Sequence, residues 1–529
     1  MAADASLTED KAGGATVVNR HSMGFREFPT FRNLGAFVRF LEQRGELARI
    51  GREVSAQCEL TEIHRRVLVA GGPALRFDHA TTAVGRASMP VVTNLFGTAA
   101  RVAAGLGVRP ERVGELGELL AALREPAPVD GLRDALARWP MVRAALNTRP
   151  QTIAAPACQQ VKWLGRDADL ARLPIQTCWP GEPAPLITWP LVITRPPDAP
   201  ADDTARMNIG VYRMQALDGR RAIMRWLAHR GGAAHHRAWK ARNEKMPVAV
   251  AIGADPATIL SAALPLPETL SELRFSGVLR GEAPRIAPAV SVPLMVPADA
   301  DIVIEGWIAP EETAPEGPYG DHTGYYNSVE PFPVLRVSAI TTRSDPVYLT
   351  TFTGRPPDEP SVIGGVFNDL ALPMIRRQIP DIVDLYLPPD ACSYRMAFVS
   401  IRKSYPGQAR RTMMALWGLL PQFSYTKLVA VFDADIDVRS MRDVAWALST
   451  RMDPQRDLML TRDTPIDYLD FASPRAGLGG KLGIDATTKI GAETQREWGK
   501  VLEMSDDVVR RVDAIWGDVQ AALDTRGRA

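Results

Sequence analysis

The densest group of side chains that could perform chemistry lies in one short segment, Glu316 to Asn327 (EGPYGDHTGYYN). The glycines and the proline in it predict a bent backbone rather than a regular strand or helix. Two carboxylates, Glu316 and Asp321, stand on this segment, and His322 follows the second of them. Paired acids in a cleft suit general acid–base catalysis because each raises the pKa of the other. A solvated polar turn has the same composition, so the segment alone leaves both interpretations open.

Two further segments have the residue types that bind a phosphate and a metal ion. Asn208–Arg213 (NIGVYR) is predicted as a strand, and Arg225–Gly232 (RWLAHRGG) combines arginines with a glycine pair that a phosphate can approach closely. Asn208, His229 and Glu272 would form an oxygen and nitrogen ligand set, which suits Mn²⁺ or Mg²⁺ better than zinc. The alternative is an edge strand with exposed arginines and a structural histidine.

A third segment, Gly477–Gly483 (GLGGKLG), is also rich in glycine. It lacks the spacing of a nucleotide-binding phosphate loop. We therefore predict a flexible loop there.

The elements that must position these groups change character along the chain. A first helix is predicted to begin at Asn33 and to end at Gly45, with an apolar face made of Leu34, Phe37, Val38 and Leu41. A helix over 59–70 and strands over 74–77 and 91–96 complete an N-terminal α/β unit.

The middle of the chain has the pattern of an antiparallel barrel or sandwich, in which short strands alternate with glycine and proline. The expected strands span 207–214, 222–227, 248–252, 301–308, 334–341 and 347–352, and one helix spans 256–263. The last third returns to α/β, because Leu428–Phe432 is a continuous apolar run typical of a buried parallel strand. A terminal helix carries an apolar stripe from Val508 to Leu523, which packs on its own domain or on a neighbouring subunit.

The composition limits the class of protein. The chain has 529 residues, 46% of them hydrophobic, and a formal charge of +1, so it is globular and has no global attraction for nucleic acid. It contains no apolar run of about 18 residues that would span a membrane. Its 4 cysteines form no disulfide framework, which favours a reducing compartment. Residues 1–27 lack a secretory signal and are predicted to be a disordered tail.

Several long runs resemble the UbiD family of decarboxylases, which use prenylated FMN. The resemblance extends from about residue 30 to about residue 500, and long runs of this kind are more specific than any short motif. They are Met207–Arg213 (MNIGVYR), Arg225–Gly232, Gly253–Leu260 (GADPATIL), Glu316–Asn327, Tyr348–Pro360, Arg451–Pro454 (RMDP), Thr464–Gly480 (TPIDYLDFASPRAGLGG) and Glu493–Trp498 (ETQREW).

The resemblance implies a mixed α+β fold with four parts. A tail (1–27) precedes an N-terminal α/β domain (28–155), a central split β-barrel that binds the flavin (156–342), and a C-terminal α/β domain that carries the terminal helix and forms oligomers (343–529).

The resemblance also implies roles for individual residues. The catalytic set is Arg213, Glu316 and Asp321, with Asp321 as a proton donor that needs a raised pKa. The second acid is aspartate here, whereas ferulate-type members carry glutamate, which argues against a cinnamic acid as substrate. The implied metal ligands are Asn208, His229 and Glu272. The implied contacts of prenylated FMN are Val211, Tyr212, Arg213, Arg225, Trp226, Leu227, Arg230, Gly231 and Lys427.

The implied reaction is the decarboxylation of a 4-hydroxy-3-polyprenylbenzoate in ubiquinone biosynthesis, with Mn²⁺ and prenylated FMN as cofactors. A flavin prenyltransferase would supply the flavin, and the chain would form a dimer or hexamer. The chain would be cytoplasmic, with peripheral contact to the inner face of the cell membrane. Two alternatives remain open at this point: a decarboxylase or carboxylase of another aromatic or heteroaromatic acid, and a non-catalytic flavin-binding component of a quinone-synthesis complex.

Overall fold

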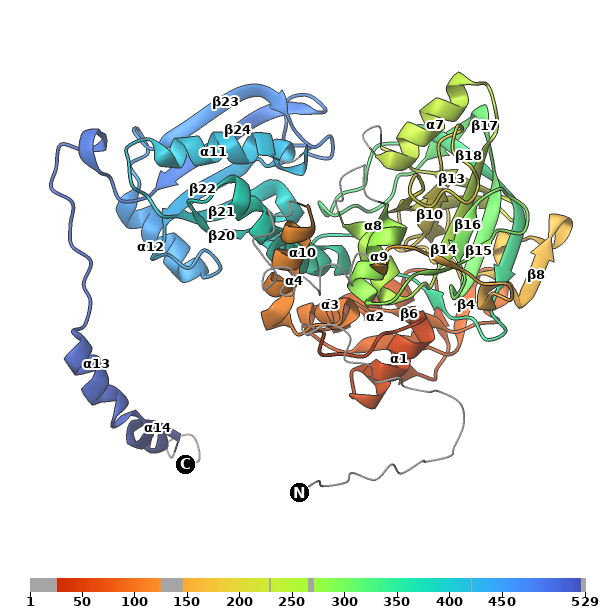
Figure 1. Ribbon diagram of the computed structural model, residues 1–529, viewed down its shortest axis with the longest axis horizontal. Helices are drawn as coiled ribbons and strands as arrows, with labels where there is room; N and C mark the ends of the chain where they lie inside the picture. The colour runs from red at the N-terminus through yellow and green to blue at the C-terminus, as the bar shows by residue number, and fades with distance from the viewer. Residues whose placement is uncertain (1–25, 125–145, 228–229, 265–270, 420, 525–529) are drawn as a thin grey trace, which may run out of the picture.

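The computed structural model describes residues 26–124, 146–227, 230–264, 271–419 and 421–524. Figure 1 shows two lobes joined at helix α10 (Glu359–Gln378), with a long terminal arm beyond them. The N-terminal and central parts of the chain form one lobe, and the C-terminal sheet forms the other (Figure 1). The mixed α+β class predicted from the sequence is confirmed. The predicted tail lies outside the described residues except for Arg26 and Glu27, and the backbone amide of Glu27 donates to the carbonyl oxygen of Gly107 at 2.9 Å.

The N-terminal unit is a small mixed sheet packed against helices. Its strand order is β1-β3-β6-β19, and the last of these strands comes from much later in the chain. Helix α1 (Leu34–Gln43) begins where predicted, since the Asn33 side chain accepts a hydrogen bond from the amide of Ala36. The remaining elements are β1 (Leu47–Ile50), β2 (Val54–Ser55), α2 (Glu59–Val69), β3 (Ala74–Phe77), β4 (Ala80–Thr82), β5 (Gly85–Arg86), β6 (Val91–Thr93), α3 (Ala99–Leu106), α4 (Val113–Arg124) and β19 (Tyr348–Leu349).

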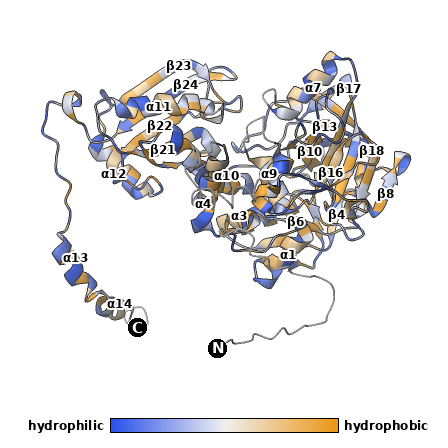
Figure 2. Ribbon diagram, viewed as in Figure 1, coloured by the Kyte–Doolittle hydropathy of each residue, from blue (hydrophilic) through white to orange (hydrophobic). Residues whose placement is uncertain are grey.

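The central domain is a curled sheet with the strand order β11-β10-β14-β17-β18-β13-β12-β9, and β8 pairs with β18. Two long antiparallel strands form its spine, β17 (Ile302–Glu316) and β18 (Glu330–Thr342). Its other strands are β8 (Val161–Leu164), β9 (Leu186–Ile187), β10 (Leu191–Thr194), β11 (Asn208–Val211), β12 (Met214–Asp218), β13 (Arg221–Met224) and β14 (Met246–Ile252). Every residue of β14 is buried, and Figure 2 shows the apolar colour concentrated on these strands.

Three helices and a small sheet flank the curled sheet. Helix α7 (Gly231–Ala241) follows the predicted phosphate-binding segment, while α8 (Pro256–Ala263) and α9 (Glu272–Arg280) lie together beside β11. The Asp255 side chain caps α8 by accepting from the amide of Thr258. The small sheet has the order β16-β15-β7 and consists of β7 (Gln151–Thr152), β15 (Arg285–Pro288) and β16 (Met295–Pro297).

The C-terminal domain is a five-stranded sheet with the order β20-β21-β22-β24-β23. The predicted buried strand is confirmed, because β22 (Leu428–Asp433) pairs in parallel with strands on both sides. Its other elements are β20 (Ile382–Tyr386), β21 (Met396–Ile401), α11 (Gln408–Leu419), α12 (Met441–Arg451), β23 (Leu458–Pro465) and β24 (Leu478–Ala486). Beyond them the chain extends as an arm with two helices, α13 (Asp506–Asp513) and α14 (Trp516–Asp524).

Three predictions about the elements are wrong. The strand expected over 207–214 is interrupted at Tyr212 and Arg213, which lie between β11 and β12. The strand expected over 347–352 is shorter and joins the N-terminal sheet instead of the barrel. The loop expected over 477–483 is largely strand β24. At Gly483 glycine provides space, since an added Cβ would lie 2.5 Å from the sulfur of Met413 on α11.

Two further expectations concern the class of protein. All four cysteines are free. Among the described helices, none has both the length and the apolar character needed to span a membrane.

Candidate active site

Glu316 is the last residue of β17, where the regular sheet ends and the bent segment begins. Its register partner is Glu330 on β18, and its side chain is fully buried. A carboxylate without access to water needs charged or hydrogen-bonding partners. Strands β11 to β13 supply those partners.

Arg213 joins the predicted catalytic residues into one cluster. It lies in the break between β11 and β12, and its Nε donates to Oε1 of Glu316 at 2.8 Å. Its Nη1 donates to Oδ2 of Asp321 at 3.1 Å, and its Nη2 donates to Oδ1 of Asn327 at 2.8 Å. The structure thus brings Arg213, Glu316 and Asp321 together. The planar guanidinium fork suits such a bridge between two carboxylates.

Arg225 is a second cation on Glu316. It follows β13, and its Nη1 donates to Oε2 of Glu316 at 2.8 Å. The guanidinium of Arg225 is 5% exposed, so the carboxylate lies between two cations in a dry environment. Replacing either arginine would leave a buried charge partly unpaired.

The ionisation of Asp321 differs from what the sequence indicated. Burial raises the pKa of this carboxyl, but the hydrogen bond from His322 and the nearby Arg213 and Arg225 outweigh burial and leave the pKa below its usual range. The expected raised pKa of Asp321 is therefore wrong for the protein without substrate. The sequence argument considered the second acid and omitted the three cations around it.

The C-terminal domain contributes residues that sequence reasoning missed. The phenol oxygen of Tyr468 accepts a hydrogen bond from Nη2 of Arg225. Oδ2 of Asp467 lies 3.7 Å from Nε2 of His322. Both residues occur in the run TPIDYLDF, which was noted only for its resemblance, and nothing in its spacing places it against the other lobe.

The predicted flavin contacts form one neighbourhood beside this cluster. The Tyr212 hydroxyl donates to Oδ1 of Asn208 at 3.1 Å, and the Gly232 amide donates to the Tyr212 hydroxyl oxygen at 3.4 Å. Nε1 of Trp226 is buried and has no hydrogen-bond partner among the described residues. Lys427 belongs to the C-terminal domain, where its Nζ pairs with Asp470 at 2.9 Å. Val211, Leu227, Arg230 and Gly231 lie along the same stretch, from the end of β11 to the start of α7.

Two of the predicted metal ligands lie together. Glu272, at the start of α9, accepts from the amide of Ile209 at 3.0 Å, next to Asn208. Burial raises the pKa of Glu272, and within the described residues this carboxylate makes no ion pair, which leaves it able to bind a cation. His229 lies outside the described residues, and no group of three or more His, Cys, Asp and Glu that could hold a metal is found within them.

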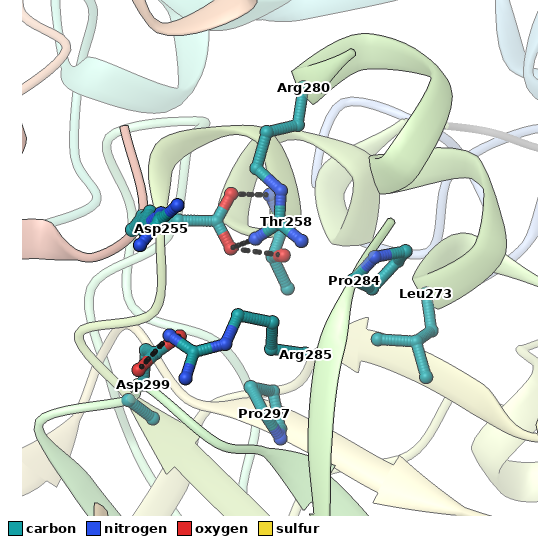
Figure 3. A pocket seen from close by; sticks show the side chains of 10 residues that line it. Asp255, Thr258, Leu273, Arg280, Pro284, Arg285, Pro297 and Asp299 are labelled. Atoms are coloured by element: carbon teal, nitrogen blue, oxygen red, sulfur yellow. Dashed lines mark hydrogen bonds and ion pairs between the residues drawn. The ribbon is translucent and has the colours of Figure 1, made fainter. Parts of the chain in front are cut away.

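A separate hollow between α8, α9 and β15 is a cluster of ion pairs and offers no room for a ligand. Figure 3 shows Arg280 directed at Asp255 and Arg285 directed at Asp299. The two pairs are 3.2 and 2.8 Å long. The hollow holds about 10 Å³, which is room for one water molecule at most.

Comparison with known proteins identifies the family. Three family profiles match consecutive parts of the chain: the 3-octaprenyl-4-hydroxybenzoate carboxy-lyase N-terminal domain over residues 38–120, the Rift-related domain over 151–356 and the C-terminal domain over 361–486. The chain belongs to the UbiD family. It is an enzyme of this family, a carboxy-lyase.

Solved UbiD-class structures have the same architecture. HmfF from Pelotomaculum thermopropionicum, solved in complex with FMN, is 28% identical over 88% of this chain and 97% of its own, with a TM-score of 0.72. The vanillic acid decarboxylase of Sedimentibacter hydroxybenzoicus in closed form is 24% identical over 92% of this chain and 99% of its own, with a TM-score of 0.78. The apo 3,4-dihydroxybenzoic acid decarboxylase of Enterobacter cloacae is 20% identical over 90% of this chain and 98% of its own, with a TM-score of 0.72. The last two support the fold alone.

Proposed function

We propose that this enzyme decarboxylates 4-hydroxy-3-polyprenylbenzoate to 2-polyprenylphenol in ubiquinone biosynthesis, with prenylated FMN as cofactor. The observation that carries this proposal is the single guanidinium of Arg213 that binds both Glu316 and Asp321 in a buried site. The family profiles, described as 3-octaprenyl-4-hydroxybenzoate carboxy-lyase domains, support the substrate class. A phenol oxygen para to the carboxylate makes the reacting ring carbon electron-rich, which favours bonding to an electrophile.

The flavin proposal is supported by HmfF, which has been solved with FMN and, as an evolved dimeric form, with prenylated FMN. When bound, prenylated FMN supplies an electrophilic centre that accepts the electron pair released by loss of CO₂. The residues that would hold it are Val211, Tyr212, Arg213, Arg225, Trp226, Leu227, Arg230 and Gly231. The unpartnered Nε1 of Trp226 and the arginines on both sides of it fit a polar, anionic ligand. Lys427 is the weakest member of the set because Asp470 already engages it.

The acids and Arg213 then have distinct tasks. Arg213 orients the carboxylate of the substrate and holds Glu316 in place. Asp321 delivers the proton that replaces CO₂ on the ring carbon. Both acids stay within reach of the same guanidinium, so the geometry is set before substrate binds.

A divalent cation, which we propose to be Mn²⁺, would be held by Asn208, Glu272 and His229. The support from the structure is the partly buried Glu272 carboxylate without a counter-ion beside the Asn208 amide. Such a cation would bind the flavin phosphate to the protein. Glu272→Gln should therefore lower both metal and flavin content, measured by elemental analysis and by absorbance of the purified protein.

The second candidate is the same reaction on another aromatic acid. Two solved structures with the same fold are decarboxylases of vanillic acid and of 3,4-dihydroxybenzoic acid, so both acids belong in the test. The site chemistry is common to both candidates. The two candidate substrates differ in the substituents on the ring, so the shape of the substrate pocket decides between the two reactions.

The deciding experiment is turnover of a short-tailed 4-hydroxy-3-prenylbenzoate by enzyme co-expressed with a flavin prenyltransferase. Cofactor and metal loading are checked by mass spectrometry and elemental analysis. Loss of the carboxylate, absent in Asp321→Asn, would support the ubiquinone-pathway reaction. Turnover of vanillate or 3,4-dihydroxybenzoate but not of the prenylated acid would support the second candidate. A fully loaded enzyme that turns over none of these acids would contradict the ubiquinone-pathway reaction and would shift the proposal to a different aromatic acid, or to an activity that needs the membrane or a partner complex.

We further propose that the terminal arm packs on a second copy of this chain. No residue of α13 is buried, and the arm exposes Leu502, Ile515 and Trp516, at 98%, 54% and 47%. Figure 1 shows the arm extended away from its own lobes, and Figure 2 shows apolar residues on its helices. Exposed apolar residues in a segment that does not reach its own domain fit an exchanged contact between subunits. An evolved form of the related HmfF is described as dimeric.

Light scattering on a size-exclusion column tests the arm. The full chain should elute as a dimer or hexamer, and a chain ending at Lys500 should elute as a smaller species. The double variant Leu502→Ser/Ile515→Ser should behave like the truncated chain. Val84→Ser, at an exposed valine far from the arm, should leave the assembly intact. Equal masses for the full and truncated chains would contradict the proposal.

The remaining partners follow from the substrate. The enzyme would depend on a flavin prenyltransferase for its cofactor. It would work in the cytoplasm and would contact the membrane peripherally to reach a polyprenylated acid. We propose no role for nucleic acid. Exposed Tyr325, Tyr326 and Phe471 beside the active-site segment provide an apolar surface for that contact. Co-sedimentation with lipid vesicles at low salt tests it. An active enzyme that stays in the supernatant would contradict it.

A further inference from the structure

His322 lies between two carboxylates that come from different lobes. Its Nδ1 is 2.8 Å from Oδ1 of Asp321, and its backbone amide donates to the same oxygen at 2.8 Å. On the opposite side of the ring, Nε2 lies 3.7 Å from Oδ2 of Asp467. An imidazole held between two carboxylates is stabilised in its charged form.

The C-terminal domain holds Asp467 rigidly in this position. Its Oδ2 accepts from the Tyr394 hydroxyl at 3.1 Å and pairs with Nη2 of Arg395 at 3.1 Å. Its Oδ1 accepts from the amide of Leu469 at 3.0 Å. Burial raises the pKa of Asp467, but His322, the Leu469 amide and Arg395 outweigh burial and lower it. Asp467 is therefore a fixed negative charge that faces His322.

The charged groups around His322 and Asp321 determine which of these two residues holds the proton. Burial lowers the pKa of His322, but Asp321 and Asp467 outweigh burial and raise it to about 9. The pKa of Asp321 is lowered, so at neutral pH the imidazole carries the proton and Asp321 is a carboxylate. Because a carboxylate can only accept, Nδ1–H is the donor in the bond between them. Asp321 therefore holds no proton of its own to deliver.

We propose that His322 is a positioning residue that stores the proton delivered by Asp321 and that Asp467 of the C-terminal domain keeps it charged. This inference rests on the proposed function. The proton moves from Nδ1 of His322 to Oδ1 of Asp321 and then to the ring carbon that has lost CO₂. The electron pair of the broken C–CO₂ bond forms the new C–H bond. Asp321 returns to a carboxylate, Nδ1 of neutral His322 regains a proton from solvent once product and CO₂ have left, and no oxidant or reductant is consumed.

The far side of the imidazole keeps its hydrogen during the transfer, because only Nδ1 gives up a proton. Nε2 of His322 is buried and has no hydrogen-bond partner among the described residues, because 3.7 Å to Asp467 is too long for one. The other charged groups near the pair are Arg213 and Arg225 on the side of Asp321, Arg395 on the side of Asp467, and Asp358 at the start of α10.

Since Asp467 and His322 belong to different lobes, the proton store is complete only when the C-terminal domain is docked. A displaced C-terminal domain would remove one of the two carboxylates that charge the ring. The charge of His322, and with it the supply of a proton to Asp321, therefore depends on the position of the C-terminal domain.

The charge of His322 can be measured without turnover. Deuterium exchange at the imidazole C2–H, followed by peptide mass spectrometry across a pH series, reports the titration midpoint of an individual histidine. The flavin- and metal-loaded full chain should give a midpoint near pH 9 for His322. Asp467→Asn should move this midpoint at least one pH unit lower. A midpoint near 6.5 in the wild type, or no change in Asp467→Asn, would overturn the proposal.

The kinetic test uses His322→Asn, whose amide can still donate to Asp321 but carries no titratable proton. We expect kcat to fall at least tenfold while KM and flavin content change less than threefold. The wild-type plateau of kcat should extend to near pH 9, whereas in His322→Asn the decline should begin below pH 7. His79→Asn, away from the site, is the matched control and should behave as wild type.

The outcomes separate this inference from the proposed function. An active wild type with an unchanged rate and pH profile in His322→Asn overturns the inference alone. A wild type that decarboxylates no acid of the panel overturns the proposed function, and the exchange midpoint still reports whether His322 is charged. If His322→Asn does not fold, the wild type and Asp467→Asn supply the comparison.

Discussion

The phenol oxygen of Tyr468, in the segment after β23, accepts a hydrogen bond from Nη2 of Arg225, which follows β13 in the other lobe. Arg225 in turn donates to Glu316 at 2.8 Å. A residue of the C-terminal domain is therefore separated from the buried carboxylate of Glu316 by a single side chain. The position of Arg225 depends on contacts from both lobes.

Tyr468→Phe should lower kcat/KM by about tenfold. The change removes one hydrogen bond to a charged group, worth about 1.5 kcal/mol, and keeps the ring beside the guanidinium, whose Cζ lies 5.6 Å from the ring centroid. Steady-state kinetics on the prenylated acid would measure it. Tyr325→Phe removes an exposed phenol hydroxyl nearby and should have no effect. Equal rates for Tyr468→Phe and wild type would show that the contact between the lobes does not influence the chemistry.

Asp321→Asn should abolish turnover while the flavin stays bound, because the amide has no proton that it can give and recover. Asp321→Glu retains a carboxyl group and should keep a measurable part of the activity, in the range of a few per cent or more. The two variants differ only in the ability to transfer a proton and in side-chain length. Product formation and flavin absorbance, read on the same samples, separate loss of chemistry from loss of cofactor. Full activity in Asp321→Asn would remove Asp321 as proton donor.

Arg213→Lys should lower kcat/KM about a hundredfold or more. A single ammonium cannot reproduce the fork that contacts Glu316, Asp321 and Asn327 together. Arg221→Lys is the matched control, since Arg221 pairs with Asp218 on the surface and is 45% exposed. We expect the control to change neither rate nor thermal unfolding. If both substitutions were equally mild, the bridging role of Arg213 would be wrong.

Gly324→Ala should destabilise the active-site segment by about 1–2 kcal/mol and reduce activity. Gly324 has a φ of +81°, and an added Cβ would lie 2.9 Å from Cβ of Arg355. Gly364, within α10, has nothing within 4 Å of an added Cβ. Gly364→Ala should therefore stabilise the protein by about 0.5–1 kcal/mol. Chemical denaturation of the two variants gives opposite signs if this account is correct.

Alkaline pH should weaken the protein through His322. Its pKa is raised in the folded protein, so the stabilisation by its charge is complete below the ordinary value of 6.5 and disappears as the pH rises through about 9. The contribution is up to about 3 kcal/mol. The measurement is the difference in thermal unfolding midpoint between wild type and His322→Asn at pH 6 and at pH 10. This difference should be large at pH 6 and small at pH 10, and a constant difference would contradict the assignment.

Local patterns in the sequence predicted much of the fold for physical reasons that are visible in particular residues. Asn33 caps α1 as expected, and the apolar run at Leu428 is a buried parallel strand. Such features depend on a few neighbouring residues. By contrast, the glycines at 477–483 were interpreted as flexibility, although Gly483 makes room for Met413 of a helix that packs on the strand.

The candidate site was predictable only in part. The bent segment and Arg213 were found because carboxylates, a histidine and an arginine occur in dense clusters. The contacts of Tyr468 and Asp467 could not be found, since they depend on how two lobes meet and not on local spacing. The direction of the Asp321 pKa was missed for the same reason, because its sign is set by cations from other segments.

The proposed catalytic groups and the C-terminal residues that contact them are positioned by two different sheets. Glu316 is anchored at the last rung of the β17–β18 ladder, while Asp467 and Tyr468 are carried by the C-terminal sheet. The reaction therefore depends on both sheets, and neither can diverge during evolution without keeping the contacts that Asp467 and Tyr468 make. A chimera that receives the C-terminal domain of a relative should stay active only if the donor supplies an acid at the position of Asp467 and a phenol at the position of Tyr468.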